Sequence, residues 1–484
     1  MRTKNQTMNR LFFCILLALP TALLAQQPYM TGLKFNDEAY ESVPLKSKLV
    51  SKDRNELPTR ADLTSYVPSV GDQGREGTCT GFATAYYMRT ILENRQRNVT
   101  TTSEKDKAIF SPSFIYNAIK DPQDQQCQGG SMIENALSYL KENGVPRLAD
   151  VPYPSCITNA DRRLDPASKI AGYSRLFSIE DPVEVKIDAT KKALSEGNPV
   201  VIGMRFVKSL SRPEPRTGLW TPARTEQPEG GHAMCVVGYD DAKYGGAFRI
   251  VNSWGTRYGD NGYLWAKYDD YAYYVRNGFE AFALPKSNPP VSEVTLSASL
   301  EFQLTTGETV PVRQSVVSKG SGIGDDGGGG VEKMVTYALR DPQTSGTKYK
   351  FFANVGKQSY LYVIGTDLSN KMTTLFPYNA SLSPIIGANT RVMLPSETKH
   401  FFLDQNRGTD FWLFLFSDKE LPIETLIQRM GQSQGTFSDR IMTVFGADLV
   451  DYRKINYRTD QVGFERKGNP KGSIVPVLVS LQHN

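Results

Sequence analysis

A proline-rich stretch at residues 285–293 divides the chain, and the hydrophobic pattern differs on its two sides. Before it, helix-compatible runs give way to short apolar runs. After it, apolar and polar residues alternate with a period of two. Polar segments rich in proline are typical of linkers between domains. We therefore predict a first domain at 61–284, a linker at 285–293 and a second domain at 294–484.

The first domain is predicted to have helices in its first half and strands in its second. Thr80–Asn98 lacks proline and favours a helix, and Met132–Asn143 favours another that ends before Gly144 and Pro146. Such segregation indicates an α+β fold rather than alternating βαβ units. Four apolar runs bounded by turn residues predict the strands: Pro199–Val207, His232–Tyr239, Ala247–Trp254 and Tyr263–Tyr268.

The second domain is predicted to be rich in β-structure. Apolar residues alternate along Val294–Leu304, which is the pattern of a half-buried strand. One helix is expected near Ile423–Met430. The aromatic runs of this domain are interpreted as core packing rather than as a ligand groove. Three further runs predict strands: Tyr349–Val355, Tyr360–Gly365 and Phe411–Phe416.

The N-terminus resembles an export signal. Basic residues precede the apolar run Leu11–Leu24, and Ala25 offers a small residue for cleavage. We predict a signal peptide at 1–25, in preference to a retained anchor, and hence a secreted or periplasmic protein. No later segment is long and apolar enough to predict a transmembrane helix. Residues 26–60 are polar, and we expect a lead-in that adds no core element.

The charge balance argues against nucleic acid as a partner. The chain carries a formal charge of +5, which falls to +2 once residues 1–25 are removed. Nucleic-acid binding needs a concentrated basic face, and no such cluster is present in the sequence.

Cys79 lies among small residues at the start of a predicted helix. A thiol becomes a nucleophile when it ionises, and the unpaired N–H groups of a helix start favour the thiolate. A nearby imidazole supplies the general base. The chain has three histidines, and His400 and His483 lie beyond the linker. His232 is therefore the base expected within the first domain.

Other residues complete a possible catalytic site. Asn252 follows a short apolar strand and could orient His232 through its amide oxygen, and Trp254 could shield that hydrogen bond from water. The main-chain N–H of Cys79 and the side-chain amide of Gln73 could stabilise an oxyanion.

Five motifs in the first domain occur in a characteristic order. They are Gln73-Gly74 before Cys79, CQGG at Cys127–Gly130, VPYPSC at Val151–Cys156, GHA at Gly231–Ala233, and NSWGTRYGDNGYLW at Asn252–Trp265. This set resembles the papain-like cysteine peptidase family. The resemblance implies a two-lobed domain, with a helical lobe and a barrel-like β lobe, and a site that needs no metal or organic cofactor.

The resemblance also implies roles for individual residues. Cys79 would be the nucleophile, His232 the general base and acid, Asn252 the orienting residue and Gln73 an oxyanion donor. The positions expected to line the cleft or contact the substrate are Gly129, Gly130, Ala233, Gly203 and Trp254.

The sequence departs from the family at the cysteine that commonly lies three residues before the nucleophile. Glu76 occupies that position, so the usual disulfide to Cys127 cannot form. Cys127 then either pairs with Cys156 or both remain thiols. Cys235 is expected to be a buried free thiol. The lead-in is too short to resemble the family's helical inhibitory pro-region, so any latency must arise differently.

The predicted function is hydrolysis of peptide bonds in peptide or protein substrates through a thioester intermediate. Acyl transfer to an amine is an alternative within the same chemistry, and a non-catalytic binding or adhesion protein on the same scaffold is another. The second domain resembles an uncharacterised β-rich domain that bacteria attach to exported enzymes. The stretches that carry this second resemblance are YLYVIGTD at Tyr360–Asp367, TTLFP at Thr373–Pro377 and VMLP at Val392–Pro395.

Overall fold

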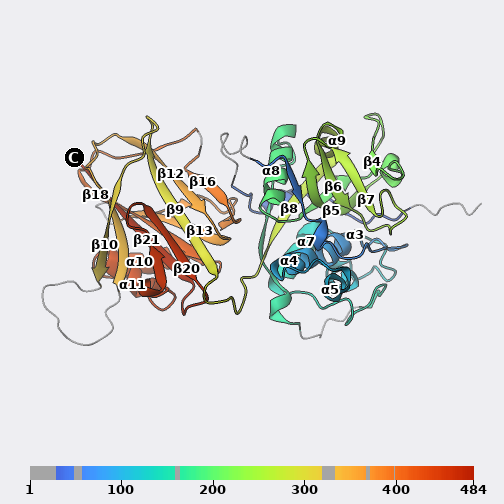
Figure 1. Ribbon diagram of the computed structural model, residues 1–484, viewed down its shortest axis with the longest axis horizontal. Helices are drawn as coiled ribbons and strands as arrows, with labels where there is room; N and C mark the ends of the chain where they lie inside the picture. Colours follow the sequence, from blue (N-terminus) through green and yellow to red (C-terminus); the bar gives the residue numbers. More distant parts are fainter. Residues whose placement is uncertain (1–28, 48–56, 158–163, 319–332, 367–370, 397) are drawn as a thin grey trace, which may run out of the picture.

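The computed structural model describes residues 29–47, 57–157, 164–318, 333–366, 371–396 and 398–484. The predicted signal peptide lies outside these ranges. Two domains lie side by side (Figure 1). The first combines a helical lobe with a lobe built on an eight-stranded sheet, and the second is mainly β-structure. The predicted α+β class with a β-rich second region is confirmed.

A central helical run forms the core of the first domain. It consists of α3 (Cys79–Gly81), the π-helical segment η2 (Phe82–Arg89) and α4 (Thr90–Gln96). Residues 79–92 are buried on every side, which explains why the sequence shows no polar face there. The other helices of this lobe are α5 (Thr102–Lys107), α6 (Pro112–Ile119) and α7 (Ile133–Glu142).

The sheet of the first domain has the strand order β2-β8-β3-β5-β6-β7-β4, with β1 paired to β5. Two helices, α8 (Val183–Ser195) and α9 (Tyr268–Tyr274), belong to this lobe. The four predicted strands are confirmed as β3, β5, β6 and β7. The strands are β1 (Arg60–Asp62), β2 (Ile170–Arg175), β3 (Val200–Arg205), β4 (Leu219–Trp220), β5 (Gly231–Asp240), β6 (Ala247–Val251), β7 (Tyr263–Lys267) and β8 (Val275–Ala283).

The N-terminal segment differs from the expected polar lead-in. We call residues 29–47 the strap; it contains helix α1 (Asp37–Ser42). Leu33, Tyr40 and Val43 are buried in the core of the first domain. The Tyr40 hydroxyl donates a 2.7 Å hydrogen bond to the carbonyl of Phe177. The prediction of no core element is wrong, because these three apolar side chains, spaced along an otherwise polar segment, enter the core of the first domain.

The second domain packs two sheets face to face. One has the order β10-β11-β21-β18-β13-β14 with β15 on β13, and the other has the order β16-β12-β9-β20-β19 with β17 on β12. Their facing side chains form one core cluster. On the outer face of the larger sheet, α10 (Ile423–Gln432) and α11 (Phe437–Phe445) cover a second cluster.

The aromatic strand β18 is buried on both faces. Trp412 and Phe414 point into the core between the sheets, whereas Leu413 and Leu415 face the helices. The interpretation as core packing is confirmed. The strands of this domain are β9 (Val294–Leu304), β10 (Val312–Ser318), β11 (Lys333–Leu339), β12 (Lys348–Val355), β13 (Ser359–Thr366), β14 (Met372–Phe376), β15 (Ile385–Ile386), β16 (Thr390–Leu394), β17 (Phe401–Phe402), β18 (Gly408–Ser417), β19 (Ile455–Tyr457), β20 (Val462–Lys467) and β21 (Ile474–His483).

The two domains pack directly against each other. Phe282 of β8 lies in a core cluster of the second domain. The Tyr360 hydroxyl donates to the carbonyl of Ala171 at 2.6 Å, and the Gln358 side chain donates to the carbonyl of Ala283 at 2.9 Å. Within the described ranges, none of the helices has both the length and the apolar character needed to cross a bilayer.

Candidate active site

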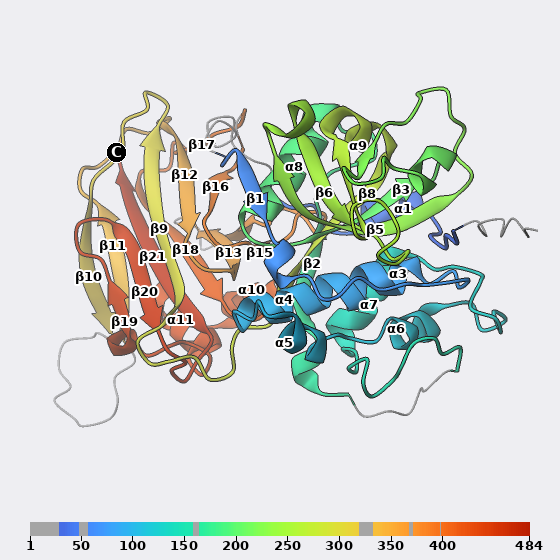
Figure 2. The ribbon, with the colours of Figure 1, turned by 45° about the vertical axis from the view of Figure 1, so that its right-hand side comes forward.

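Cys79 and His232 come from different lobes and meet at their junction. Cys79 begins the central helix, and His232 is the second residue of β5 (Figure 2). Ala233, next to His232, directs its main-chain N–H to the Cys79 thiol. The helix start and the strand start therefore place a thiol beside an imidazole.

Asn252 fixes the orientation of His232. Asn252 follows β6, and its Oδ1 lies 2.8 Å from His232 Nε2. The same Oδ1 accepts the main-chain N–H of Ser253 at 2.8 Å, so the amide is held with its oxygen toward the ring. His232 Nδ1 is buried and has no hydrogen-bond partner among the described residues. A proton on Nε2 leaves Nδ1 free to accept a proton from the thiol.

Trp254 shields this pair. Its ring stacks on His232 with the centroids 4.4 Å apart and an interplanar angle of 20°. Trp254 is 2% exposed, so water has little access to the hydrogen bond between His232 and Asn252.

Gln73 is held beside the thiol by its own hydrogen bonds. Its Oε1 accepts the Ser253 hydroxyl at 2.6 Å, and its Nε2 donates to the carbonyl of Glu76 at 2.8 Å. Nε2 also donates to the carbonyl of Met30 at 3.2 Å. The amide hydrogen that an oxyanion would need is therefore directed at a main-chain oxygen of the strap.

The strap runs through the junction of the lobes and pairs with both walls. Leu33 N–H donates to the carbonyl of Gly231 at 3.2 Å. On the opposite wall, Ser131 N–H donates to the carbonyl of Gly32 at 2.8 Å, and Lys34 N–H donates to the carbonyl of Ser131 at 3.0 Å. Residues 32–34 thus lie between the two lobes in the manner of a short strand, with isolated β-bridges from Leu33 to Gly231 and to Ser131.

Two further groups hold the start of the strap. The Trp254 indole N–H donates to the carbonyl of Met30 at 3.0 Å. The Tyr29 ring stacks on the Trp254 ring, with the centroids 4.6 Å apart. Gln73 and Trp254 therefore both donate to one oxygen of the strap.

Gly32 passes the nucleophile at very close range. A Cβ on Gly32 would lie 2.0 Å from the carbonyl oxygen of Gly77, which belongs to the backbone and cannot turn aside. A Cβ on Gly130 would lie 2.2 Å from the Gly32 oxygen, and Gly130 has a positive φ of 75°. Both positions require glycine, because side chains of any size would push the strap out of the cleft.

The predicted substrate-contacting residues take different positions around this strand. Gly130 packs against it, but its N–H donates to the Tyr116 hydroxyl. Gly129 is one residue further away, with its N–H bonded to Asp124. Gly203 faces the Leu33 side chain, since a Cβ there would meet Leu33 Cδ2 at 2.8 Å.

Ser131 was not expected from the sequence. Its main-chain groups, rather than those of Gly129 or Gly130, pair with the strap, and nothing in the residue type distinguishes it.

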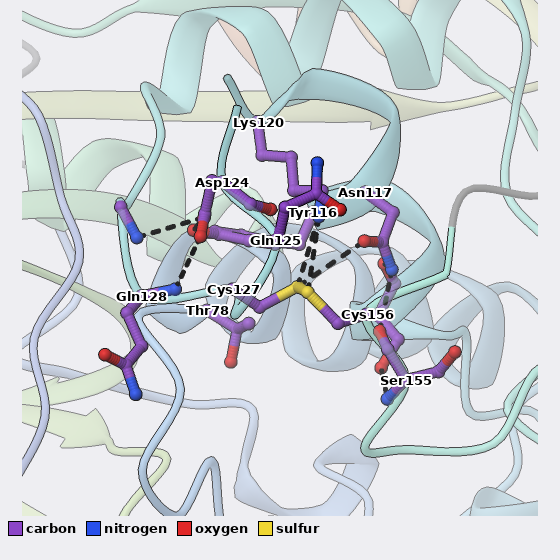
Figure 3. Close-up of a disulfide and its surroundings, with 12 residues drawn as sticks. Thr78, Tyr116, Asn117, Lys120, Asp124, Gln125, Cys127, Gln128, Ser155 and Cys156 are labelled. Atoms are coloured by element: carbon purple, nitrogen blue, oxygen red, sulfur yellow. Dashed lines mark hydrogen bonds between the residues drawn. A yellow bond between two sulfur atoms is a disulfide. The ribbon is translucent and has the colours of Figure 1, made fainter. Parts of the chain in front are cut away.

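A disulfide supports the wall that carries Gly129–Ser131. Cys127 and Cys156 are bonded, with their Cα atoms 5.8 Å apart (Figure 3). Lys120 Nζ lies 3.2 Å from Cys156 Sγ and donates to the carbonyl of Asp124. The alternative in which Cys127 pairs with Cys156 is confirmed, and Cys235 is a buried free thiol as predicted.

Burial keeps both reacting groups neutral in this form. Cys79, His232 and Asn252 are 0% exposed. Burial raises the pKa of the Cys79 thiol to about 11, although main-chain N–H groups of Ala233 and Gly32 oppose the shift. Burial likewise lowers the pKa of His232 to about 4, with the hydrogen bond to Asn252 acting in the opposite direction. A thiolate–imidazolium pair is therefore unfavourable while the strap is in place.

Comparison with known proteins finds a family match that covers most of the first domain. Residues 57–278 match the papain family cysteine protease. The first domain is similar to papain family cysteine proteases. Residues 344–420 match a domain of unknown function, DUF4384, so the expected uncharacterised β-rich domain is also confirmed.

Two curated proteins similar to the first domain come from a virus and from a eukaryote. An uncharacterised peptidase C1-like protein of Acanthamoeba polyphaga mimivirus is 29% identical over 40% of this chain and 62% of its own length. A cathepsin L-like proteinase of Fasciola hepatica is 27% identical over 43% of this chain and 60% of its own. The match thus spans about six-tenths of these relatives, and a bacterial source is not indicated by them.

Among solved structures, xylellain, a cysteine protease from Xylella fastidiosa, is 26% identical, with a TM-score of 0.42. The similarity covers 53% of this chain and 96% of that one.

Proposed function

We propose that this chain is an exported cysteine peptidase that hydrolyses peptide bonds through a thioester on Cys79. The observation that carries the proposal is the state of His232. It is fixed by Asn252 through Nε2, has an unpaired Nδ1, and comes just before Ala233, whose main-chain N–H is directed at the Cys79 thiol. Most buried polar atoms are hydrogen-bonded, so a buried Nδ1 without a partner favours a role in proton transfer over a purely structural one.

In the proposed reaction, Cys79 Sγ attacks the carbonyl carbon of the scissile bond as its proton passes to His232 Nδ1. The oxyanion accepts hydrogen bonds from Gln73 Nε2 and the Cys79 N–H. His232 then gives the proton to the leaving amine, and the C–N bond breaks to leave a thioester. Water attacks the thioester carbonyl and gives a proton to His232; the C–S bond breaks, the acid leaves, and His232 returns the proton to Cys79 Sγ.

The form with the strap in the cleft is proposed to be inactive. The Met30 carbonyl accepts a hydrogen bond from the Gln73 amide, and the main-chain N–H of Gly32 is directed at the Cys79 thiol. A substrate chain needs the same space between Ser131 and Gly231. The expected export agrees with the disulfide, because disulfides persist in oxidising compartments.

Hydrolysis of a quenched fluorescent peptide library tests the function. Because Gly32→Ala should expel the strap, we expect cleavage by the Gly32→Ala chain and none by Gly32→Ala/Cys79→Ala. In the same background Gln73→Ala should lower kcat by about a hundredfold, through loss of one oxyanion donor.

The alternatives give different results in the same assay. Ligated products on addition of an amine nucleophile would favour acyl transfer. Absence of both cleavage and ligation by a Gly32→Ala chain whose Cys79 is accessible would contradict the proposal and favour a binding protein.

A further inference from the structure

The second domain holds the far end of the strap. The strap starts on the side of the protease domain remote from the second domain and ends at the boundary between the two (Figures 1 and 2). At that boundary, Leu45 N–H donates to the carbonyl of Ser381 at 2.7 Å, and the Leu45 carbonyl accepts the N–H of Ser383 at 2.9 Å. Both main-chain groups of Leu45 are therefore bonded to the second domain.

The residues on either side of Leu45 face the protease domain. Arg175 N–H donates to the carbonyl of Pro44 at 3.1 Å, and Lys46 N–H donates to the carbonyl of Arg175 at 2.9 Å. Because alternate residues of a strand point their hydrogen-bonding groups to opposite sides, residues 44–46 join the two domains as one strand between them.

The side chain of Lys46 adds a charged contact at the same place. Its Nζ lies 2.5 Å from Glu196 Oε2 and 2.8 Å from Glu280 Oε2, and all three side chains are buried. Thr390 of the second domain completes this cluster, since its hydroxyl donates to Glu196 Oε1 at 2.5 Å. The second domain thus contributes to the site that holds Lys46 as well as to the strand.

We propose that the second domain is the anchor of the strap, so that its docking on the protease domain keeps residues 29–34 in the cleft. Its ligand is the strand segment 44–46 of this same chain, bound by the edge formed by residues 381–383 and by Thr390. This gives a role to a domain that the family comparison leaves without one. The proposal rests on the inhibitory position of the strap and not on the reaction that Cys79 performs.

The test uses the full chain and two variants that weaken the anchor without touching the cleft. Leu45→Pro removes the N–H that donates to Ser381, and Thr390→Val removes the hydroxyl that donates to Glu196 in nearly the same volume. The matched control is Thr336→Val, because Thr336 is a buried threonine whose hydroxyl makes a part-buried hydrogen bond to Ser315, between β10 and β11 within the second domain. Hydrogen exchange at Leu33 and Lys34 measures release of the strap, and alkylation of Cys79 measures access to the cleft.

We expect both anchor variants to raise exchange at Leu33 and Lys34, and the Cys79 alkylation rate, by about tenfold each, as loss of one hydrogen bond of this kind implies. The control should change neither. Unchanged exchange in a folded Thr390→Val chain would overturn the proposal, as would an equal rise in Thr336→Val.

These readouts separate the two proposals. Faster exchange without any peptide hydrolysis would uphold the anchor and count against the peptidase. Peptide hydrolysis at a rate that neither anchor variant changes would support the peptidase and count against the anchor.

Discussion

The two ends of the strap are held by different kinds of contact. In the cleft, residues 30–34 make main-chain hydrogen bonds of 2.8–3.2 Å to uncharged groups, and most of these residues are partly exposed. At the anchor, Lys46 is 6% exposed and pairs with two carboxylates that are themselves buried. Burial lowers the pKa of Lys46, but Glu196 and Glu280 outweigh it and the pKa is raised overall.

This difference indicates which end can exchange with a substrate. A peptide or water can replace neutral main-chain hydrogen bonds at little net cost. Lys46 cannot leave without removing a cation from two buried carboxylates, of which Glu196 keeps the more distant Lys192 at 3.4 Å. We therefore expect the cleft end to open while the anchor end stays bound.

Lys46→Met should give the largest effect, because it breaks the anchor. Removal of one partner of a buried ion pair costs about 3–5 kcal/mol, and here Glu280 and Glu196 both lose the Lys46 cation, although Glu196 keeps Lys192. Chemical denaturation should report that loss, and the alkylation rate of Cys79 should rise as the strap detaches. A folded variant with unchanged stability and an unchanged Cys79 alkylation rate would show that Lys46 does not hold the anchor end of the strap.

Cys156→Ser should give the next largest effect, on the wall rather than on the strap. The disulfide closes a loop with a sequence separation of 29, and its loss should cost about 3 kcal/mol. Since Cys127 precedes Gly130 and Ser131, hydrogen exchange should rise in that loop while the Leu45 hydrogen bonds remain protected. Equal loss of protection at Leu45 would mean that the cleft and the anchor form one cooperative unit.

Gly32→Ala should break the cleft end selectively. The added Cβ overlaps the Gly77 carbonyl, and overpacking of this kind costs about 2 kcal/mol, which corresponds to about thirtyfold faster alkylation of Cys79. Gly431→Ala is the control, because a Cβ there meets nothing within 4 Å. If Gly32→Ala left the alkylation rate unchanged, the strap would not be what covers the thiol.

The smallest effect is on the titration of His232. Burial holds its pKa at about 4 in the covered form, so the ring should stay neutral at every pH well above 4. In Gly32→Ala the pKa should rise to its ordinary value of 6.5 or beyond, because solvent and the thiolate both favour the imidazolium. Nuclear magnetic resonance of ¹³C-labelled histidine would measure this, and three histidines give a simple spectrum. The same His232 pKa in the intact chain and in Gly32→Ala would contradict the claim that burial under the strap lowers it.

Local patterns predicted the elements that depend on one face being buried. Strand β9 covers Val294–Leu304 as expected, because alternation alone specifies which side chains enter the core. The helix that follows Cys79 was predicted as well, although its π-helical middle was not, since that depends on how the buried run packs.

The strap could not be recognised from its sequence, because its contacts are distant in the chain. Leu45 pairs with Leu382, and Lys46 meets Glu196 and Glu280, so no local pattern records either contact. Residues of the candidate site were found through short motifs, but the main-chain pairing at Ser131 was missed for a similar reason: it is set by the backbone and not by the side chain.

The most direct test of the account is the rate at which an epoxysuccinyl thiol inactivator labels Cys79, measured by mass spectrometry at neutral pH. We predict slow labelling of the intact chain, rapid single addition at Cys79 in Gly32→Ala, and a strong decrease when His232→Ala is added to that variant. Labelling of Gly32→Ala at the rate of an ordinary thiol, with or without His232, would contradict the claim that the strap covers a competent nucleophile.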